Sequence, residues 1–459
     1  MKEQRRSECG LTRRGFMGGA AAVAALAVVP RHVLGGSARP APSEKMNIGC
    51  VGVGGMQGAG DVRNVGGSEN IYAMCDVDAS QFEKIAPKFP AAKQYRDFRE
   101  MLDKEQKNLH GITITIPDFM HATVAMWAME RGIAVHCQKP LTQTVWEARL
   151  LTHAAQKYKV PTQMGNQGYS SEATRVACEI LWHGDIGDVS EVHSWSGGGF
   201  ARGITEWPAV EPVPATMNWD LWTGRAAEHT YSSKIHPSNW RGFLDYGTQM
   251  IGDWGIHMLG PANWGLQLGS PASVQCTAVE GVNPVTYPSY SCKMEFPGRP
   301  NKYVPSGKMP PVTVYWYEGS MAKTFNRPEG LAPEDLKNCN ELFIGAKGFL
   351  GTGGRGESVR LVPEAKMQGY KKPDPVLKRS PGHFKDWIQA CKGGEAACSN
   401  FGIAGPYTEW MLLGAICWRF PNEKLLWDAK NLRFTNNEKA NEFIKPRFRK
   451  GWELKDIKA

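Results

Sequence analysis

The stretch NIGCVGVGGMQGAG, residues 47–60, decides the fold of the first half of the chain. It begins with an apolar, β-branched run short enough for a buried strand, and glycines follow at positions 52, 54, 55 and 58. The residues AGDVRNV then have the pattern of a helix, and NIYAMCDVD has that of a second buried strand ending in Asp76. Strand, glycine turn, helix, strand and acid together predict the βαβ unit that binds a dinucleotide.

Each part of this unit has an expected role in holding a cofactor. The loop residues expected to contact it are Gly52, Gly54, Gly55, Met56, Gln57 and Gly58. Gly52 permits the tight turn, Gly54 lets the backbone approach a pyrophosphate, and the helix N-terminus offers free N–H groups to the phosphates. Asp76 would accept hydrogen bonds from the ribose hydroxyls and repel a 2′-phosphate, which favours NAD over NADP.

One position departs from this motif. The third glycine should stand at 57, where the chain has Gln57, and Gly58 comes one residue late. We therefore expect looser packing between the helix and the first strand. A glycine-rich turn that binds nothing is the alternative to a cofactor loop.

From 46 to 166 strand-like and helix-like runs alternate. GITITIP (111–117), AVHCQKP (134–140) and PTQMGN (161–166) are separated by helical patterns. This alternation predicts a doubly wound parallel sheet, whose ligands gather at the carboxyl ends of the strands. The polar residues expected at those ends are Asp76, Pro117–Asp118, Gln138–Lys139 and Asn166. The sequence therefore predicts the cofactor site at this edge of the sheet.

The pattern changes beyond residue 166. SEATRVACEILWHGDIG predicts a helix, and YGTQMIGDWGIHMLGPANWGLQLG is mostly helical. Alternating runs such as SVQCTAVEG, SCKMEF and VTVYWYEG predict a largely antiparallel sheet with one open face. The expected fold class is α/β, with an N-terminal Rossmann domain at 46–166 and a C-terminal α/β domain at 167–459.

The first 38 residues are expected to be an export signal. Arg13 and Arg14 precede an apolar stretch from Ala20 to Val29, which is too short for an ordinary membrane span. This order is typical of a twin-arginine signal peptide, here with cleavage after Ala38 and a linker at 39–45. We expect export by the twin-arginine machinery to the periplasm or another extracytoplasmic compartment; an uncleaved N-terminal anchor is the alternative.

Composition indicates a globular chain of 459 residues with 42% hydrophobic content, long enough for two domains. Residues 1–38 hold six basic and two acidic side chains, so without them the net charge falls from +9 to +5. No basic run is interleaved with aromatic residues, so we expect no nucleic-acid partner. No C-x-x-C pair is present, and we expect no metal.

Lys139, Asp253 and His257 form the candidate catalytic set. Lys139 stands at a strand end, where an ammonium group lowers the pKa of a substrate hydroxyl. Asp253 and His257 are four residues apart on the expected helix and share one face. A histidine oriented by a carboxylate can shuttle the proton that leaves a hydroxyl as hydride goes to NAD. A solvated lysine and a purely structural helix pair are the alternatives.

The Trp/Pro-rich stretch 207–240 holds four tryptophans. Aromatic rings with scattered polar groups suit carbohydrate, whose apolar C–H face stacks on them. Trp240, Arg241 and His236 are the candidate substrate contacts. An aromatic core beneath long loops is the alternative.

The chain resembles the glucose–fructose oxidoreductase / inositol dehydrogenase / MocA (Gfo/Idh/MocA) family, in its exported branch. The ordered motifs that carry the resemblance are GVGG, CDVD, IPDFMHATVAMWAMERG, HCQKPLT, GNQG, NWRGFLDYGTQMIGDWGIHMLGPANW and GIAGPYTEWMLLGAI. The resemblance implies a Rossmann domain, an open-faced C-terminal sheet, a sugar or cyclitol substrate and a homo-oligomer.

The resemblance also assigns roles. The E-K-P lysine of the family corresponds to Lys139, and its D-x-G-x-H pair to Asp253 and His257. Its T-P-D-x-x-H turn corresponds to Pro117, Asp118 and His121, which it implies lie near the nicotinamide ribose.

Two positions depart from the family pattern. Gln138 replaces the usual glutamate before the lysine, and Gly260 stands where many relatives have a second aspartate. These changes affect the expected substrate contacts and leave the expected fold unchanged.

Three functions remain open on the sequence alone. The first is an NAD-dependent oxidoreductase acting on a sugar, sugar derivative or cyclitol with tightly bound cofactor. The second is a redox-neutral NAD-dependent glycoside hydrolase, which oxidises C3 transiently so that the C2 proton becomes acidic and the leaving group is eliminated. The third is a noncatalytic sugar- or dinucleotide-binding protein.

Overall fold

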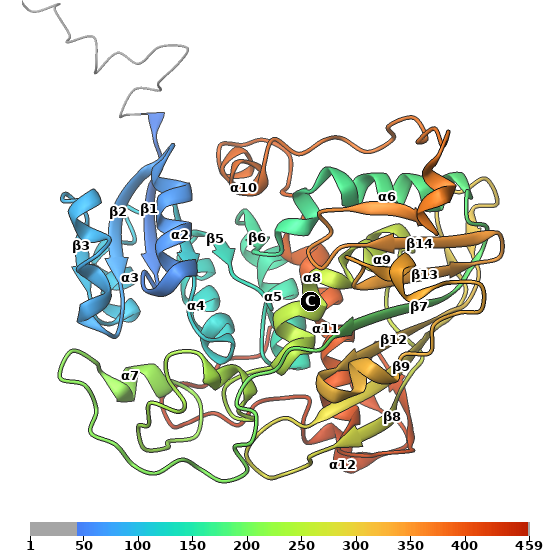
Figure 1. Ribbon diagram of the computed structural model, residues 1–459. Coiled ribbons are helices and arrows are strands. Elements are labelled where there is room, and N and C mark those ends of the chain that lie inside the picture. Colours follow the sequence, from blue (N-terminus) through green and yellow to red (C-terminus); the bar gives the residue numbers. More distant parts are fainter. Residues whose placement is uncertain (1–43, 458–459) are drawn as a thin grey trace, which may run out of the picture.

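The computed structural model describes residues 44–457, and the expected export signal and most of the expected linker lie outside them. Two sheets organise the described chain, one on each side of Figure 1. The first has the order β3-β2-β1-β4-β5-β6 with parallel pairing throughout, which is the doubly wound order expected for a Rossmann domain.

The Rossmann strands are β1 (Asn47–Val51), β2 (Asn70–Cys75), β3 (Lys93–Tyr95), β4 (Gly111–Ile114), β5 (Ala134–Cys137) and β6 (Thr162–Met164). Its helices are α2 (Gly55–Gly66), α3 (Phe98–Glu105), α4 (Asp118–Met129) and α5 (Val145–Tyr158), with short helices η2 (Ala79–Phe82), η3 (Ala86–Lys88) and η4 (Gln167–Ser170). The strands β4 and β5 are buried along their whole length, as expected for strands covered on both faces.

The second sheet has nine strands in the order β15-β14-β13-β7-β12-β9-β8-β16-β17. Only β7 and β12 pair in parallel; the other neighbours in this sheet are antiparallel. Side chains of β12 alternate between buried and half-buried, so one face packs on the core and the other stays partly open. The expected fold class is thereby confirmed.

The strands of this half are β7 (Val189–Ser196), β8 (Ser273–Glu280), β9 (Ser289–Phe296), β12 (Val312–Glu318), β13 (Glu341–Gly345), β14 (Gly348–Thr352), β15 (Val359–Val362), β16 (Lys424–Asp428) and β17 (Arg433–Phe434), with a separate hairpin of β10 (Arg299–Pro300) and β11 (Lys308–Met309). The helices are α6 (Glu172–His183), α7 (Trp219–Thr223), α8 (Ile256–Met258), α9 (Gly260–Gly265), α10 (His383–Cys391), α11 (Phe401–Cys417) and α12 (Glu438–Asn441). Short helices are η5 (Asn239–Gly242), the π-helix η6 (Ile251–Gly255), η7 (Gly319–Thr324), η8 (Pro333–Leu336) and η9 (Glu364–Met367).

The C-terminal part of the chain returns to the Rossmann sheet. Trp387 and Ile388 of α10 share a buried cluster with Ile48 of β1 and Val62 of α2. A Cβ at Gly111 of β4 would lie 2.9 Å from the Trp387 ring, so glycine lets the helix approach this strand closely. The two halves are therefore packed together and not joined by a flexible link.

Residues 197–250, which we call the strap, cross from β7 to the Rossmann domain. In Figure 1 this segment, with α7, runs beneath the Rossmann strands. The Thr216 carbonyl accepts a hydrogen bond from the Ala79 N–H at 2.8 Å, and the Asn218 N–H donates to the Val77 carbonyl at 2.9 Å. The strap is thus fixed to the turn that follows β2.

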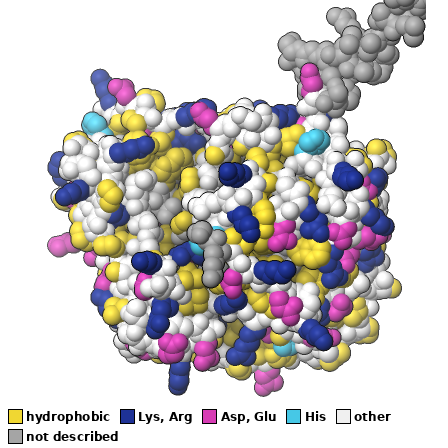
Figure 2. Space-filling view, turned by 180° about the vertical axis from the view of Figure 1, so that it is seen from behind, with side chains coloured by type: hydrophobic (Ala, Val, Ile, Leu, Met, Phe, Trp, Pro, Cys, Tyr) yellow, Lys and Arg dark blue, Asp and Glu magenta, His cyan; other side chains and the backbone are white. Residues whose placement is uncertain are grey.

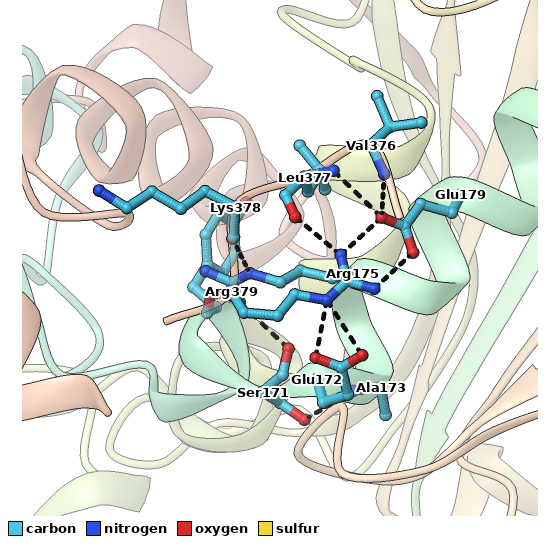
Figure 3. Close-up of polar contacts among 10 residues, drawn as sticks. Ser171, Glu172, Ala173, Arg175, Glu179, Val376, Leu377, Lys378 and Arg379 are labelled. Atoms are coloured by element: carbon cyan, nitrogen blue, oxygen red, sulfur yellow. Dashed lines mark hydrogen bonds and ion pairs between the residues drawn. The ribbon is translucent and has the colours of Figure 1, made fainter. Parts of the chain in front are cut away.

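The connector that leads from the second sheet to α10 is fixed to α6, as Figure 3 shows. Glu179 accepts hydrogen bonds from the N–H groups of Val376 and Leu377, at 2.8 and 3.1 Å. The Arg379 guanidinium binds both carboxylate oxygens of Glu179, at 2.6 and 2.8 Å. Arg175 donates to the connector from the same helix, at 2.7 Å to the Lys378 carbonyl. One side of α6 therefore anchors the segment that places α10.

Replacing Glu179 by glutamine is expected to lower the free energy of unfolding by about 2 kcal/mol near neutral pH. Burial alone would raise the pKa of Glu179, but the bonds from Arg379 and the connector N–H groups hold it below its ordinary value of 4.5. The lowered pKa stabilises the fold only while the carboxylate is charged. Wild type is therefore expected to keep its full stability advantage over Glu179→Gln above the ordinary pKa of 4.5. This advantage is lost as the pH falls through the folded-state pKa.

Urea unfolding at neutral and at acidic pH measures this difference. The matched control is Glu172→Gln, on the same helix and bound to the same arginine, but with a side chain 62% exposed against 1% for Glu179. An unfolding free energy of Glu179→Gln equal to wild type at neutral pH would show that this anchor does not stabilise the fold.

Two further observations concern the surface and the membrane. On the face drawn in Figure 2, lysine and arginine side chains are interspersed with acidic ones and with apolar patches. Among residues 44–457, no helix has the length and apolar character needed to cross a bilayer.

Candidate active site

The glycine loop has the shape that a dinucleotide requires. Gly52 has φ +80°, and a Cβ there would lie 2.1 Å from the Thr115 carbonyl oxygen, so only glycine fits. Gly54 precedes α2 and provides no side-chain cap, so the helix N–H groups that follow Gly55 are not capped by it. The side-chain oxygen of Gln81 approaches the loop and accepts a hydrogen bond from the Gly55 N–H at 3.3 Å. An acceptor oxygen can therefore reach this backbone.

The expected loose packing of α2 on β1 is wrong. A Cβ at Gly58 would lie 2.7 Å from the Gly52 carbonyl oxygen, so this glycine provides the close helix–strand approach one residue later than the motif places it. Gln57 is exposed and donates to Asp61 at 2.8 Å, and Met56 is 91% exposed beside the loop.

Asp76 lies directly against the glycine loop. One carboxylate oxygen accepts from the N–H groups of Val53 and Gly54, at 3.0 and 3.2 Å, and the other accepts from the Asp78 N–H at 3.0 Å. A carboxylate has about four lone-pair sites, so one remains for a ribose hydroxyl. Asp76 therefore holds the loop in shape in addition to its predicted role.

Lys139 and Asp253 meet between the two halves of the molecule. The Lys139 Nζ donates to Asp253 Oδ1 at 2.6 Å and to the Asp253 carbonyl at 3.0 Å. Arg241 of the strap reaches the same Oδ1, with its Nε at 3.4 Å. Burial alone would raise the pKa of Asp253, but these two cations hold it below its ordinary value. One anionic oxygen is thus shared by two cations.

The expected pairing of Asp253 with His257 is wrong. In the structure the Asp253 carboxylate forms ion pairs with Lys139 and Arg241, because charged donors bind it more strongly than a neutral imidazole does. Burial, helped by the Lys139 charge, lowers the pKa of His257 well below its ordinary value. Its Nδ1 is buried and has no hydrogen-bond partner among residues 44–457. His257 is therefore a neutral ring whose Nδ1 has no partner within the described part of the chain.

The π-helix η6 places these residues. Its Gly252 allows a close approach, since a Cβ there would lie 1.9 Å from the Thr248 hydroxyl oxygen. π-Helical turns are frequent at functional sites, and their wider turn moves side chains off the regular helical spacing. The sequence predicted a regular helix over this segment.

Asp118 and His121 are both buried, and both have hydrogen-bond partners within the protein. The Thr248 hydroxyl donates to Asp118 at 2.7 Å, and burial raises the pKa of this carboxyl to about 7 against the opposing charge of Arg241. The two ring nitrogens of His121 lie 2.8 Å from the carbonyl oxygens of Pro140 and Ile116. His121 thus ties together the turns after β4 and β5, and its ring atoms are occupied by backbone.

Gln138 has a partner that the sequence did not reveal. Its amide Nε2 donates to Asp61 of α2 at 2.8 Å, and Thr115 donates to the same carboxylate oxygen at 2.8 Å. A glutamate at 138 would face the buried carboxylate of Asp61, so glutamine at this position is explained by that neighbour. Spacing gave no signal for Asp61, because 77 residues separate the pair.

Asn166 lies at the end of β6, at the same edge of the sheet. Its Oδ1 accepts from the Ser399 hydroxyl at 2.5 Å, while its Nδ2 is buried without a partner in the described part of the chain. Buried polar atoms are nearly always bonded, so this donor marks a place where a polar ligand fits. With the glycine loop and Asp76, it makes the edge suitable for NAD.

The three candidate substrate residues lie in different surroundings, and they do not form one site. Trp240 is 4% exposed and lies under Arg241, whose Cζ is 4.3 Å from its ring centroid, so the expected sugar contact through Trp240 is wrong. His236 lies on the Asp78 side of the strap, edge-on to Trp222 at 5.8 Å. Arg241 is the one of the three that reaches the Lys139–Asp253 pair.

Arg355 is a further candidate that the sequence did not single out. It stands on the loop between β14 and β15, is exposed, and lies over the Trp254 ring at 5.2 Å. That ring is 6.2 Å from the ring of His257.

Within residues 44–457, His, Cys, Asp and Glu side chains form no group of three or more that could hold a metal ion.

Comparison with known proteins agrees with this division into two halves. Residues 46–166 match the model of the Gfo/Idh/MocA oxidoreductase family described as its NAD-binding Rossmann fold. Residues 191–284 match the model described as the family's C-terminal alpha/beta domain.

Two curated relatives are similar in part of the chain. D-apiose dehydrogenase of Paraburkholderia graminis is 30% identical over 125 residues, 27% of this chain and 32% of the relative. Inositol 2-dehydrogenase of Salmonella typhimurium is 28% identical over 153 residues, 32% of this chain and 45% of the relative. The chain thus spans less than half the length of these relatives.

Solved structures share the fold over most of the chain. The WlbA dehydrogenase from Bordetella pertussis, in complex with NADH and UDP-GlcNAcA, has a TM-score of 0.55 at 14% identity and covers 84% of this chain and 99% of its own. An inositol dehydrogenase homolog from Azotobacter vinelandii, complexed with NADH and myo-inositol, has a TM-score of 0.53 at 14% identity and covers 84% and 98%. Two segments of the chain, 46–166 and 191–284, thus match the two domain models of the Gfo/Idh/MocA family of oxidoreductases.

Proposed function

We propose that the protein is an NAD-dependent oxidoreductase that acts on a hydroxyl group of a sugar, sugar derivative or cyclitol and keeps its cofactor tightly bound. The observation that carries the proposal is the meeting of Lys139 from the Rossmann domain with Asp253 from η6, close to the neutral His257. The names of the relatives, D-apiose dehydrogenase and inositol 2-dehydrogenase, support a sugar or cyclitol as substrate.

Each group of the site has a separate role when the substrate hydroxyl is oxidised. NAD, held by the glycine loop, Asp76 and Asn166, supplies the group that accepts a hydride. Lys139 Nζ, fixed by Asp253, donates a hydrogen bond to the substrate hydroxyl oxygen and stabilises the negative charge that develops there. The neutral His257 ring accepts the hydroxyl proton.

A panel of sugars and cyclitols tests the reaction class. A dehydrogenase accumulates reduced nicotinamide, seen at its absorbance band, when no acceptor is supplied. Return to NAD⁺ in every cycle, with solvent deuterium at C2 of a glycoside product, would instead identify the redox glycosidase. Binding without either signal would leave the noncatalytic binding protein.

We propose that the strap retains the cofactor. Arg96 bonds three backbone carbonyls around Asp76: that of Asp76 at 3.2 Å and those of Val77 and Thr216 at 2.5 Å each. With the backbone bonds of Thr216 and Asn218, this closes the strap over the turn that carries the ribose-binding acid. Departure of the adenosine end then requires the strap to separate from the turn.

Replacing Arg96 by glutamine is expected to raise the NAD dissociation rate about 10-fold, because the strap loses its charged contact with the turn. Stopped-flow competition with a fluorescent nucleotide analogue measures the rate. The control is Arg131→Gln, since Arg131 pairs with Asp103, a residue of the Rossmann domain, at 2.6 Å. Equal rates in wild type and Arg96→Gln would remove the strap from cofactor retention.

Free dinucleotide is scarce outside the cytoplasm. An exported enzyme must therefore be folded with its NAD before export and hold that NAD tightly afterwards. We propose the twin-arginine route on the strength of Arg13, Arg14 and the apolar stretch that follows. Replacing both arginines by lysine is expected to leave the precursor in the cytoplasm, as judged by fractionation and immunoblotting. Normal export of that variant would show that another route is used.

We also propose that the protein forms a homo-oligomer through the open face of the nine-stranded sheet. Aromatic side chains gather there: the buried His193 stacks on the half-buried Tyr315 at 4.4 Å, and the half-buried Trp195 stacks on Phe325 at 4.8 Å. Such a face favours a second copy as its cover. Native mass spectrometry tests the state, and a monomer at micromolar concentration would contradict it.

A further inference from the structure

The charges around Lys139 do not balance. Lys139 and Arg241 share a single oxygen of Asp253, at 2.6 and 3.4 Å. Their side chains are 18% and 30% exposed, so solvent screens both charges only in part. Asp118, the other acid nearby, is buried, and its pKa of about 7 leaves it only partly charged near neutral pH. His257 is neutral. The pair of cations is thus offset by little more than one anion.

Arg241 keeps donors available. Its Nε faces Asp253, its Nη1 makes one long contact of 3.4 Å with the Ser238 carbonyl, and its guanidinium lies over the Trp240 ring. Stacking on an aromatic ring fixes the plane of the guanidinium and leaves its edge for hydrogen bonds. The remaining terminal N–H groups form a fork of the kind that binds carboxylate, phosphate or sulfate.

Arg355 adds a third cation further out. Side-chain exposure increases from the buried His257 through the half-buried Trp254 to the exposed Arg355, which lies over the Trp254 ring. In the described part of the chain its guanidinium has no hydrogen bond or ion pair. Glu357 on the same loop accepts from the Arg355 backbone N–H, at 2.6 Å, and not from the guanidinium.

We infer that the substrate is a sugar that carries an anionic group, held by Arg241 and Arg355 while Lys139 and His257 act on the hydroxyl. The inference rests on the proposed function and specifies its substrate class. Two arginines from separate segments, the strap and the β14–β15 loop, select the substituent, and the Rossmann-side lysine meets the reacting oxygen. An anionic substituent also neutralises a partly buried excess of positive charge that a neutral sugar leaves uncompensated.

The test compares matched sugars on the purified protein. Glucuronate and galacturonate are paired with glucose and galactose, and glucose 6-phosphate and glucose 6-sulfate distinguish carboxylate from other anions. We expect kcat/KM at the reduced-nicotinamide band to be at least about 10-fold higher for an anionic sugar than for its neutral parent. We expect the preference to shrink as NaCl rises from about 50 to about 500 mM.

Variants locate the effect. Arg355→Gln is expected to raise KM for the anionic sugar about 10-fold and to reduce the ratio of kcat/KM between the anionic sugar and its neutral parent. Arg241→Lys, which keeps the charge and loses the fork, is expected to give part of that effect. The matched control is Arg433→Gln on the edge strand β17, whose guanidinium lies 3.6 Å from an exposed glutamate. It should behave as wild type.

Binding gives a readout that does not depend on turnover. Anionic sugars are expected to raise the melting temperature of the protein more than their neutral parents do, and Arg355→Gln is expected to remove the difference. Equal kcat/KM and equal binding for charged and neutral sugars would overturn the charge selection while the oxidoreductase function stands. If no sugar reduces the nicotinamide, the proposed function fails, and the melting data alone decide whether the anionic site is real.

Discussion

Replacement of Lys139 by alanine is expected to lower kcat by about 10²–10⁴-fold while NAD stays bound. Lys139 Nζ is the cation that the structure fixes at 2.6 Å from Asp253 Oδ1, at the junction of the two halves of the molecule. Without it the oxygen of the substrate hydroxyl loses the charge that stabilises its deprotonated form. Asp253 keeps Arg241 as a partner, so the carboxylate is not left unpaired.

Kinetics on the preferred substrate, together with dinucleotide released from denatured protein, measure the two parts of this prediction. The control is Lys104→Ala, an exposed lysine paired with Glu100 one turn away on α3. A kcat within a few-fold of wild type in Lys139→Ala, with NAD retained, would exclude Lys139 from the chemistry.

Replacement of Arg225 by methionine is expected to destabilise the fold by about 3–5 kcal/mol. Arg225 belongs to the strap and pairs with Glu147 of α5 at 2.9 Å, with side chains 3% and 0% exposed. It also donates to the Phe119 carbonyl and to Gln143, at 2.5 and 2.6 Å. Methionine would fill much of the space but leave the buried Glu147 carboxylate without a cation.

Urea unfolding curves with an unchanged m-value measure the loss. The double variant Arg225→Met with Glu147→Met should recover much of it, because removing both charges avoids a lone buried one. A single variant within about 1 kcal/mol of wild type would show that the pair does not fasten the strap to the Rossmann domain.

Local patterns in the sequence predict the Rossmann half well. The glycine turn after β1 and the acid after β2 lie within one supersecondary unit, where spacing alone fixes which atoms meet. The positions of Lys139 and Asn166 at the edge of the sheet follow from the rule that parallel strands end at a common edge. Motif spacing failed at one position of this unit. The motif assigns the close helix–strand contact to position 57, but Gly58 provides it.

The catalytic contacts depend on distant segments and could not be predicted in the same way. Asp253 lies 114 residues from Lys139 in sequence, so helical spacing gave it His257 as a partner, whereas folding brings two stronger donors. The π-helical turn, the Gln138–Asp61 pair and Arg355 over Trp254 likewise arise from packing between segments. Aromatic composition alone also placed Trp240 in the sugar site, although its ring is buried beneath Arg241.

The central claim is that the protein carries its own NAD and that a sugar reduces it in place. The direct measurement is the absorbance of the purified protein after mixing with substrate, with no dinucleotide added. We expect the reduced-nicotinamide band to appear with an amplitude matching one cofactor per chain, and to appear much more slowly in Lys139→Ala. Absence of the band on every anionic and neutral sugar, in protein that releases no dinucleotide on denaturation, would contradict the account.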